Sequence, residues 1–539
     1  MNIDDLVRYW GRTRPEHPAI IFGDITQTWG ELDAVTDALA RGLAGRGVGK
    51  GDRVGILMKN RLEVAWTMLA ALRLGAISVP LNFRLLASEL LPMLTDCAPR
   101  VVVTEADLAD LLEPAHQVLG FDMFATETND LPAFGTLLAE PGPVPSSSGP
   151  SSSGPPSSVP PSSVPPNPGP AIELADEDPA FICYTSGTTG VQKGALLTHR
   201  SILAVGQAAV ITHGLSWRDR VLAAAPLVYT GSGISVFMQL VVYPGATMVL
   251  LHEFDAELGL DAIVKHQVTA CTMVPVIWDR MARLPAFTSQ RLAGFTMAAA
   301  GGAPVRTELL ELFHAQGIPL TQVYGLTEAS GLAATMRYED ALSRPGFAGL
   351  PLLGTRIRIG DPHGETLPAH EVGEIMVAGP HLMHSYWNRP EDTAAVIEGG
   401  WLRTGDLGLQ DEDGFLKLVD RSKDLLISGG LNVYPAEIEQ ALAATEGVLE
   451  LAVIGVPDDT WGEVPMVIFR TDGDPAAVRG RLAEGAAASL ARFKQPKYAV
   501  SADEPLPRTF SGKLAKPVLR QRFPAAPADS VLLRADDGR

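Results

Sequence analysis

Short apolar segments alternate with amphipathic stretches from about residue 18 to residue 420. The segments that predict strands are, in chain order, RVGILMKN, AISVPLN, RVVVT, AFICYTS, TMVLL, ACTMVPV, FTMAAA and TQVYG. RLEVAWTMLAALRLG and GLDAIVKHQ carry apolar residues at helical spacing and predict helices. This alternation of strands and helices favours an α/β architecture whose sheets are largely parallel.

Two changes in composition divide the chain. Residues 141–170 form a degenerate Ser/Pro/Gly repeat with few side chains able to pack, which predicts a disordered insert. Such a segment is either a docking site for a proline-recognising partner or an expanded surface loop, and its composition favours the loop. Near residue 420 a small mixed unit begins, in which residues 449–470 predict two strands around a turn. We therefore expect an N-terminal domain at 1–419, a hinge at 420–424, a mobile C-terminal domain at 425–525 and a flexible tail at 526–539.

Length, charge and cysteine content narrow the class of protein. A chain of 539 residues is too long for one hydrophobic core, and its net charge of -19 disfavours binding to nucleic acid or to anionic membranes. The three cysteines are scattered without CxxC spacing, which fits a reducing compartment, so we expect a cytoplasmic protein. No apolar run approaches the length of a membrane span. The sequence also lacks the HExxH spacing of zinc enzymes and the GxSxG elbow of hydrolases.

A stretch rich in glycine and hydroxyl side chains, YTSGTTGVQKG, follows an apolar predicted strand. Gly187 and Gly190 allow the backbone to approach an anion closely, and Lys193 supplies a mobile positive charge. The hydroxyl donors beside these glycines are Ser186, Thr188 and Thr189. Composition alone therefore predicts either a phosphate-binding loop or a Gly/Thr-rich hairpin that binds no ligand.

The full string closely resembles the phosphate-loop signature of the adenylate-forming superfamily. That superfamily contains acyl-CoA synthetases, the adenylation domains of nonribosomal peptide synthetases and firefly-type luciferases. Segments similar to its other signatures follow in the family's order: AAAGGAPV, YGLTE, WLRTGDLGLQDEDGFLKLVDRSKD, ISGGLNVYPAEIE and LPRTFSGKLAK. The resemblance covers nearly the whole chain outside the Ser/Pro/Gly insert and the tail. It implies an α/β fold, with a large N-terminal domain of packed α/β subdomains and a distorted β-barrel, joined by the hinge to a small α+β C-terminal domain.

The activity implied by the resemblance is that of an ATP-dependent acyl-CoA synthetase, with ATP, Mg²⁺ and coenzyme A as the bound small molecules. A carboxylate first attacks the α-phosphorus of MgATP, which gives acyl-AMP and pyrophosphate. The thiolate of CoA then displaces AMP. The first transition state gathers negative charge around the α-phosphate, so catalysis rests on positioning and electrostatic stabilisation.

The resemblance also implies a role for each matching residue. Lys513 bridges the α-phosphate and the attacking carboxylate, Lys423 lies at the hinge, and Asp406 binds the ribose hydroxyls. Glu328 is implied to bind Mg²⁺ together with the hydroxyl of Thr188, and Tyr324 to stack near the adenine. The other residues implied to contact ATP are Thr185, Ser186, Gly187, Thr189, Gly190, Lys193, Gly301, Gly302, Ala303, Gln322, Gly325, Thr327 and Arg421. Those implied to face CoA are Ser428, Gly429 and Gly430.

The acyl pocket implied by the resemblance draws on small or uncharged residues: Tyr229, Thr230, Gly231, Gly233, Gly325 and Ala329. An uncharged pocket suits a monocarboxylic acid, and a fatty acid and an arylpropenoic acid stay equally open. The stretch PLVYTGSGISVF contains no aspartate to hold an amino group, and no carrier domain follows it, which disfavours a peptide synthetase. A second carboxylate on the substrate lacks an evident arginine partner in the sequence.

Two positions depart from the family pattern. Val191 and Gln192 stand where many relatives have a proline before the lysine, and Tyr229 stands where many have a histidine. Three alternatives stay open: a stand-alone adenylation enzyme that loads a carrier protein, a luciferase-like oxygenating relative, and a catalytically silent nucleotide-binding scaffold. The intact thioester-site segment favours CoA, and the retained lysines and carboxylates of the motifs disfavour the scaffold. The sequence leaves open whether two copies associate as a homodimer.

Overall fold

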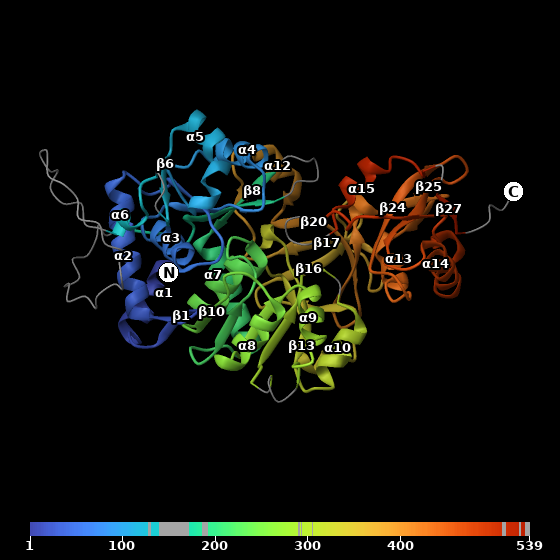
Figure 1. Ribbon diagram of the computed structural model, residues 1–539, viewed down its shortest axis with the longest axis horizontal. Coiled ribbons are helices and arrows are strands. Elements are labelled where there is room, and N and C mark those ends of the chain that lie inside the picture. The colour runs from blue at the N-terminus through green and yellow to red at the C-terminus, as the bar shows by residue number, and fades with distance from the viewer. Residues whose placement is uncertain are drawn as a thin grey trace, which may run out of the picture.

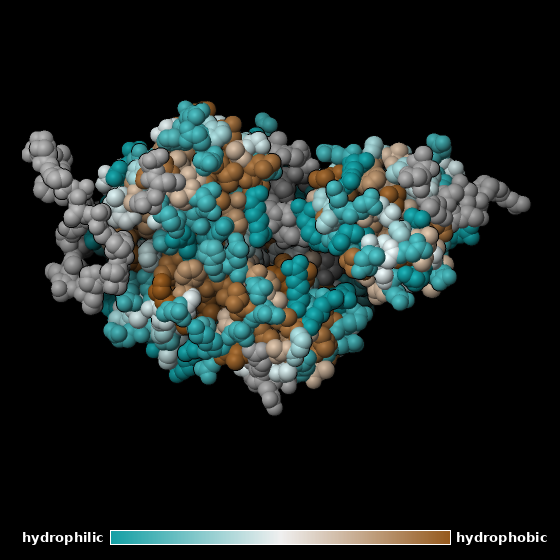
Figure 2. Space-filling view, viewed as in Figure 1, coloured by the Kyte–Doolittle hydropathy of each residue, from teal (hydrophilic) through white to brown (hydrophobic). Residues whose placement is uncertain are grey.

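The computed structural model describes residues 1–127, 131–138, 172–185, 192–288, 292, 294–303, 305–508, 514–527 and 530–533. The predicted insert at 141–170 lies outside them. The described residues form a large N-terminal body and a smaller C-terminal body beside it (Figure 1). Polar residues cover much of the viewed face of both, interrupted by smaller apolar patches (Figure 2). No helix in the described part of the chain combines the length and apolar character needed to cross a membrane.

A seven-stranded sheet forms one part of the N-terminal body, in the order β18-β8-β7-β4-β3-β5-β6. Its parallel strands are β3 (Arg53–Leu57), β4 (Ile77–Pro80), β5 (Val101–Thr104), β6 (Asp122–Ala125) and β7 (Pro179–Thr185). Two strands are antiparallel to their neighbours, β8 (Lys193–Thr198) and β18 (Ser385–Tyr386). The parallel strands β3 to β6 are buried almost throughout, as expected for a sheet that helices cover on both faces.

A 14-stranded sheet forms the other part. Its mainly parallel half contains β1 (Pro18–Phe22), β2 (Ile25–Thr28), β9 (Arg220–Ala223), β10 (Thr247–Leu250), β11 (Ala270–Met273), β12 (Met297–Ala300) and β13 (Leu320–Tyr324). Its antiparallel half contains β14 (Ala334–Thr335), β15 (Phe347–Pro351), β16 (Arg356–Gly360), β17 (Gly373–Ala378), β19 (Ile397–Glu398), β20 (Trp401–Gln410) and β21 (Leu416–Arg421). The antiparallel strands extend the parallel sheet, and their pairings among the described residues do not close a barrel.

The C-terminal body has its own six-stranded sheet. Its strands are β22 (Leu426–Ser428), β23 (Leu431–Val433), β24 (Glu450–Asp458), β25 (Gly462–Arg470), β26 (Tyr498–Ser501) and β27 (Val531–Leu532). The β24–β25 hairpin confirms the two strands predicted for residues 449–470, with Glu450 opposite Arg470 and Asp458 opposite Gly462. Two apolar clusters on this sheet give the C-terminal body a core separate from those of the N-terminal body.

Helices pack against these sheets, and the predicted segments 61–75 and 259–267 correspond to α3 and α8. The helices are α1 (Ile3–Thr13), α2 (Trp29–Gly45), α3 (Leu62–Arg73), α4 (Ala87–Cys97), α5 (Glu113–Leu119), α6 (Gly135–Leu138), α7 (His199–His213), α8 (Ala256–Lys265), α9 (Pro275–Ala282), α10 (Thr307–His314), α11 (Tyr338–Ala341), α12 (Pro390–Val396), α13 (Pro435–Leu442), α14 (Pro475–Ser489) and α15 (Lys516–Arg522). The short 3-10 segments are η1 (Ala106–Leu111), η4 (Thr327–Ala329), η5 (Ser422–Asp424) and η6 (Arg492–Lys494), and the π-helical segments are η2 (Thr230–Ile234) and η3 (Val236–Val242).

The predicted hinge region joins β21 to the C-terminal sheet. The Asp420 carboxylate accepts the backbone N–H of Ala436 at 2.8 Å, at the start of α13. Arg520 of α15 donates to Asp424 at 2.7 Å. Polar contacts of both side chains therefore tie the connection to the C-terminal body, whose first strand begins two residues later at Leu426.

Candidate nucleotide and acyl site

The β7–β8 hairpin places Lys193 opposite Thr185, at the carboxyl-terminal end of β7. Ser186, Gly187, Thr188, Thr189 and Gly190, predicted to contact phosphate, lie outside the described residues. Lys193 Nζ forms an ion pair with Asp392 Oδ1 of α12 at 2.5 Å and lies 5.4 Å from the centre of the Tyr386 ring. Lys193, the lysine of the predicted phosphate loop, is therefore held by a carboxylate and an aromatic ring, both from the segment around β18 and α12.

Glu328 lies in η4, directly after β13, and is brought to the same place. Its Oε1 accepts a hydrogen bond from the Tyr386 hydroxyl at 2.8 Å and a longer one from the Thr185 hydroxyl at 3.5 Å. Burial, reinforced by the Glu328 charge, raises the pKa of Tyr386, so this hydroxyl stays a donor. Among the described residues Glu328 Oε2 has no hydrogen-bond partner. Tyr386 thus joins Glu328 and Lys193, which lie far apart in the sequence.

These residues fit a magnesium ion that arrives with ATP. Mg²⁺ commonly uses one or two carboxylates, several waters and the phosphates of its substrate. Glu328 offers one carboxylate oxygen that no described residue occupies, beside the hydroxyl of Thr185. Within the described ranges, no group of three or more acidic, histidine or cysteine side chains is arranged to hold a metal ion. A metal here would therefore depend on the phosphates for most of its ligands.

Asp406 lies on β20 opposite Arg421 of β21. Its two carboxylate oxygens accept from the Tyr324 hydroxyl at 2.9 Å and pair with Arg421 Nε at 3.2 Å. Tyr324 is 4% exposed, and its pKa is raised by burial and by the Asp406 charge. The Tyr324 ring belongs to a buried apolar cluster of the antiparallel strands. Its hydroxyl therefore fixes the predicted ribose-binding carboxylate.

Gln322, Gly301 and Gly302 lie where β12 and β13 run side by side. A Cβ on Gly301 would lie 2.6 Å from the Val323 side chain, and Gly302 has a positive φ of +82°, which favours glycine. Ala303, which follows them, is exposed. Gln322 is 5% exposed, yet its Oε1 has no hydrogen-bond partner among the described residues. A buried acceptor without a donor is costly, and a ligand N–H would satisfy it.

The glycines of the predicted acyl pocket differ in the space that they leave. A Cβ on Gly233 would lie 2.2 Å from the Pro226 carbonyl oxygen, and one on Gly325 would lie 2.1 Å from that of Gly331. A Cβ on Gly231 would meet its nearest neighbour, the Gly331 carbonyl oxygen, at 3.8 Å. Close backbone packing therefore explains glycine at 233 and 325, whereas a Cβ at Gly231 would make only an ordinary van der Waals contact. Thr230 and Gly231 begin π-helical η2, a geometry that often marks functional sites.

Tyr229 precedes η2, and its hydroxyl makes long polar contacts with two neighbouring side chains. Its hydroxyl accepts from Arg84 at 3.5 Å and donates to Asn82 Oδ1 at 3.3 Å. Burial raises the pKa of Tyr229, while the Arg84 charge opposes that rise. Asn82 is 7% exposed, and its Nδ2 has no hydrogen-bond partner among the described residues. An exposed arginine therefore lies beside the predicted acyl pocket.

The predicted CoA-facing residues lie on the β22–β23 turn of the C-terminal body. Ser428 is buried, and Gly429 and Gly430 have φ angles of +59° and +80°. A Cβ on Gly429 would lie 2.6 Å from the Trp461 ring. Lys423 in η5 is exposed, and its pKa is lowered first by partial burial and then by the neighbouring Arg421 charge. Lys513 lies outside the described residues.

Comparison with known proteins decides the family. The family model described as "AMP-binding enzyme" matches residues 7–387, and "AMP-binding enzyme C-terminal domain" matches residues 437–513. The chain belongs to the AMP-binding enzyme family. It is 34% identical to a long-chain-fatty-acid–CoA ligase of Mycobacterium tuberculosis over 93% of this chain and 94% of the relative. It is also 34% identical to an indoleacetate–CoA ligase of Aromatoleum aromaticum, over 97% and 98%. The predicted family, fold class and enzyme class, an AMP-forming acid–thiol ligase, are confirmed.

Solved structures of related enzymes share this fold over nearly the whole chain. ATP-bound MatB from Rhodopseudomonas palustris superposes with a TM-score of 0.85 at 29% identity, covering 97% of this chain and 99% of that one. The match with apo MatB also covers 97% of this chain and 99% of that one at 29% identity, with a TM-score of 0.74. The o-succinylbenzoate CoA synthetase of Bacillus subtilis in complex with its acyl-adenylate has a TM-score of 0.82 at 31% identity, over 96% and 97%.

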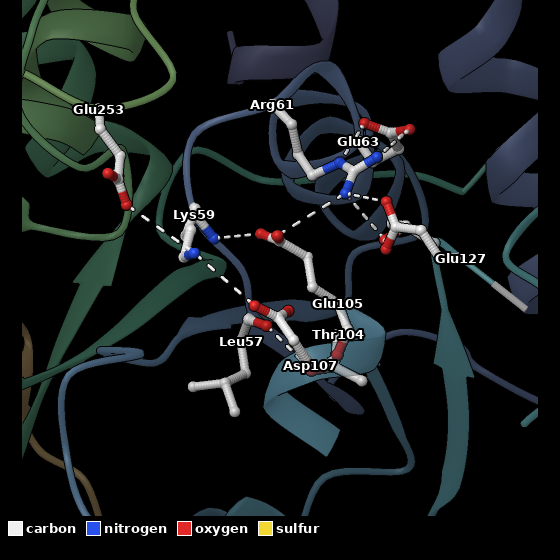
Figure 3. Close-up of polar contacts among 10 residues, drawn as sticks. Leu57, Lys59, Arg61, Glu63, Thr104, Glu105, Asp107, Glu127 and Glu253 are labelled. Atoms are coloured by element: carbon white, nitrogen blue, oxygen red, sulfur yellow. Dashed lines mark hydrogen bonds and ion pairs between the residues drawn. The ribbon is translucent and has the colours of Figure 1, made fainter. Parts of the chain in front are cut away.

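A second charged cluster of this AMP-binding enzyme lies at the carboxyl ends of β3 and β5 (Figure 3). Glu105 accepts the Lys59 backbone N–H at 2.6 Å, and Arg61 pairs with Glu127 at 2.6 Å and Glu63 at 2.9 Å. Parallel sheets often bind ligands at this edge. Here both cations already face several carboxylates, which include the more distant Asp107 and Glu253 on Lys59. The cluster therefore connects loops and leaves neither cation free for an anion.

The sequence reasoning missed Tyr386, Asp392 and Arg84. Tyr386 and Asp392 lie in SYWNRPEDT, between the YGLTE and TGD segments, and no local pattern marks them as neighbours of Lys193. Arg84 follows β4 closely, so its place after the carboxyl end of a parallel strand was the one available signal.

Proposed function

We propose that this enzyme joins a monocarboxylic acid with a fatty or aromatic body to CoA, and that ATP binds along Lys193, Glu328, Gln322 and Asp406. The observation that carries the proposal is the meeting of Lys193 and Glu328 at Tyr386. A lysine from one sheet and a carboxylate from the other converge there. That pair suits the phosphates of a nucleotide and their metal.

Each described residue then has a distinct task. The Asp406 carboxylate, oriented by Tyr324 and Arg421, accepts from the ribose hydroxyls. The unpartnered Oε1 of Gln322 accepts from the exocyclic amine of adenine. Lys193 exchanges its contact with Asp392 for a phosphate oxygen. Magnesium, held by Glu328 and Thr188, would neutralise phosphate charge when bound.

The C-terminal body completes the first reaction and takes part in the second. Lys513 would approach the α-phosphate of ATP and the attacking carboxylate of the acid. The carboxylate would bond to the α-phosphorus, and pyrophosphate would leave, so that acyl-AMP forms. Rotation about residues 420–424 would then withdraw Lys513 and bring Ser428 to Gly430 towards the CoA thiol, which displaces AMP. The higher TM-score with ATP-bound MatB than with apo MatB, 0.85 against 0.74, supports a domain arrangement suited to the first step.

Arg84 favours a second substrate class, an aromatic acid that bears another carboxylate. No arginine partner for such a group was evident in the sequence, but Arg84 reaches the Tyr229 hydroxyl at 3.5 Å and forms no ion pair among the described residues. Relatives at 33–36% identity include 2-succinylbenzoate–CoA ligases of Bacillus and Geobacillus species. An aromatic dicarboxylate therefore belongs in any substrate panel.

Acid-dependent exchange of labelled pyrophosphate into ATP tests the proposal. The panel contains short, medium and long fatty acids, benzoate, cinnamates, indoleacetate, 2-succinylbenzoate and several amino acids, all without CoA. Exchange with one of the carboxylic acids is the expected result, and its loss in Glu328→Gln would assign the metal-side carboxylate. Exchange with amino acids alone, or with no acid, would contradict the proposal.

A further inference from the structure

The segment 385–393 contacts both groups proposed to act on the phosphates. Tyr386 donates to Glu328 at 2.8 Å, and Asp392 pairs with Lys193 at 2.5 Å. The backbone N–H of Tyr386 donates to the Thr393 hydroxyl at 2.9 Å, which fastens α12 to β18. Asp392 and Tyr386 therefore belong to one local unit.

The ion pair between Lys193 and Asp392 engages the ammonium group that a phosphate would need to bind. Lys193 is 16% exposed at its side chain and Asp392 is 36% exposed, so solvent screens the pair only in part. A phosphate oxygen and the Asp392 carboxylate are both anions and compete for the same ammonium group. A nucleotide that reaches Lys193 must therefore displace Asp392 or lie close to it and be repelled.

The attachment of α12 allows such displacement. None of the residues Pro390–Val396 is buried. A shallow cavity of about 490 Å³ lies along the start of this helix, lined by Tyr386, Asn388, Arg389, Pro390, Thr393 and Ala394 among others. In the first turn of α12 the Thr393 hydroxyl is held by the Tyr386 N–H, but no residue of the turn is buried and the turn borders this cavity, so Asp392 is not packed in place.

We propose that Asp392 is a counter-ion that competes with the phosphates of ATP for Lys193 and replaces pyrophosphate on that lysine as it leaves. The inference rests on the proposed function, because it takes Lys193 to be a phosphate contact. Asp392 acts through Lys193 and is a positioning residue. It weakens the binding of ATP and of pyrophosphate alike. The enzyme therefore binds ATP less tightly but releases pyrophosphate faster.

Asp392→Asn tests this directly, because it removes the charge and keeps the size. A partly exposed ion pair is worth about 0.2–1 kcal/mol, so the KM for ATP should fall by about 1.4- to 5-fold. The inhibition constant of pyrophosphate as a product should fall by the same factor. A purely structural role would lower the thermal midpoint and leave both constants unchanged. Glu391→Gln is the matched control, because Glu391 is an exposed neighbouring acid with no ion-pair partner among the described residues.

Calorimetry with magnesium pyrophosphate separates this inference from the proposed function, because it needs no acid substrate. Tighter binding to Asp392→Asn than to the wild type and to Glu391→Gln is expected. Equal or weaker binding, or no binding to any of the three proteins, would overturn the inference. Failure of every acid in the exchange assay, with tighter pyrophosphate binding by Asp392→Asn, would overturn the proposed function and leave the inference standing.

Discussion

Replacing Asp406 with asparagine keeps the size of the side chain but removes the charge that Tyr324 and Arg421 share. The wild-type carboxylate accepts from Tyr324 at 2.9 Å and pairs with Arg421 at 3.2 Å. An asparagine amide has one acceptor oxygen, so either Tyr324 or Arg421 loses its acceptor. In the proposed ATP complex one ribose hydroxyl loses its acceptor as well. A hydrogen bond to a charged group contributes about 1.5–3 kcal/mol. We expect the free energy of unfolding to fall by about that amount, and the KM for ATP to rise by about 10- to 100-fold.

The assay is pyrophosphate exchange at varied ATP, with urea unfolding measured alongside. Asp4→Asn is the matched control, because Asp4 is 8% exposed and also bridges two arginines, Arg73 and Arg8, each at 2.7 Å. It lies on α1, away from β20 (Figure 1). The control should lose stability without a change in the KM for ATP. A KM for ATP within twofold of wild type in Asp406→Asn would refute the role of this carboxylate in binding the ribose.

Three further changes test the packing and the pH response. Gly325→Ala would place a Cβ 2.1 Å from a backbone carbonyl oxygen and should lower the free energy of unfolding by about 1–3 kcal/mol. Gly480→Ala, in open space on α14, is the control and should not lower it. Equal losses of the two variants in urea unfolding would contradict the packing argument. Burial lowers the pKa of His199 from 6.5 to about 4, so the unfolded chain binds more protons between these values and stability is lost as the pH falls. When the pH is lowered from 7 to 5, the free energy of unfolding of His199→Asn should therefore fall by about 2 kcal/mol less than that of the wild type. Parallel curves of unfolding free energy against pH for the two proteins would contradict this role of His199. Arg61→Ala should lower the free energy of unfolding by about 1–3 kcal/mol, because the buried Glu105 carboxylate loses a cation, and an unchanged denaturation midpoint would show that Arg61 in the cluster of Figure 3 adds no stability.

The sequence predicted those parts of the fold that depend on local pattern. Apolar runs such as RVVVT became buried parallel strands, and the alternating residues of 449–470 became the β24–β25 hairpin. The ordered motifs identified the family because each is a contiguous string. The sequence did not predict the contacts that join the motifs, because they depend on the three-dimensional path of the chain.

Asp392 and Lys193 illustrate that limit, since 199 positions separate them in the sequence. Arg84 and Tyr229 are 145 positions apart. The glycines at 233 and 325 show a different limit. The family resemblance placed both in the acyl pocket, but neighbouring backbone already fills the space that a side chain would take. A glycine in the sequence does not show that a pocket has free volume there, because neighbouring backbone can fill that volume.

The most direct test of the central claim is acid-dependent release of AMP, measured with and without CoA across the full acid panel. We expect sustained AMP formation that needs both a carboxylic acid and CoA. AMP formation that ignores CoA, that occurs with amino acids alone, or that occurs with no acid would contradict it.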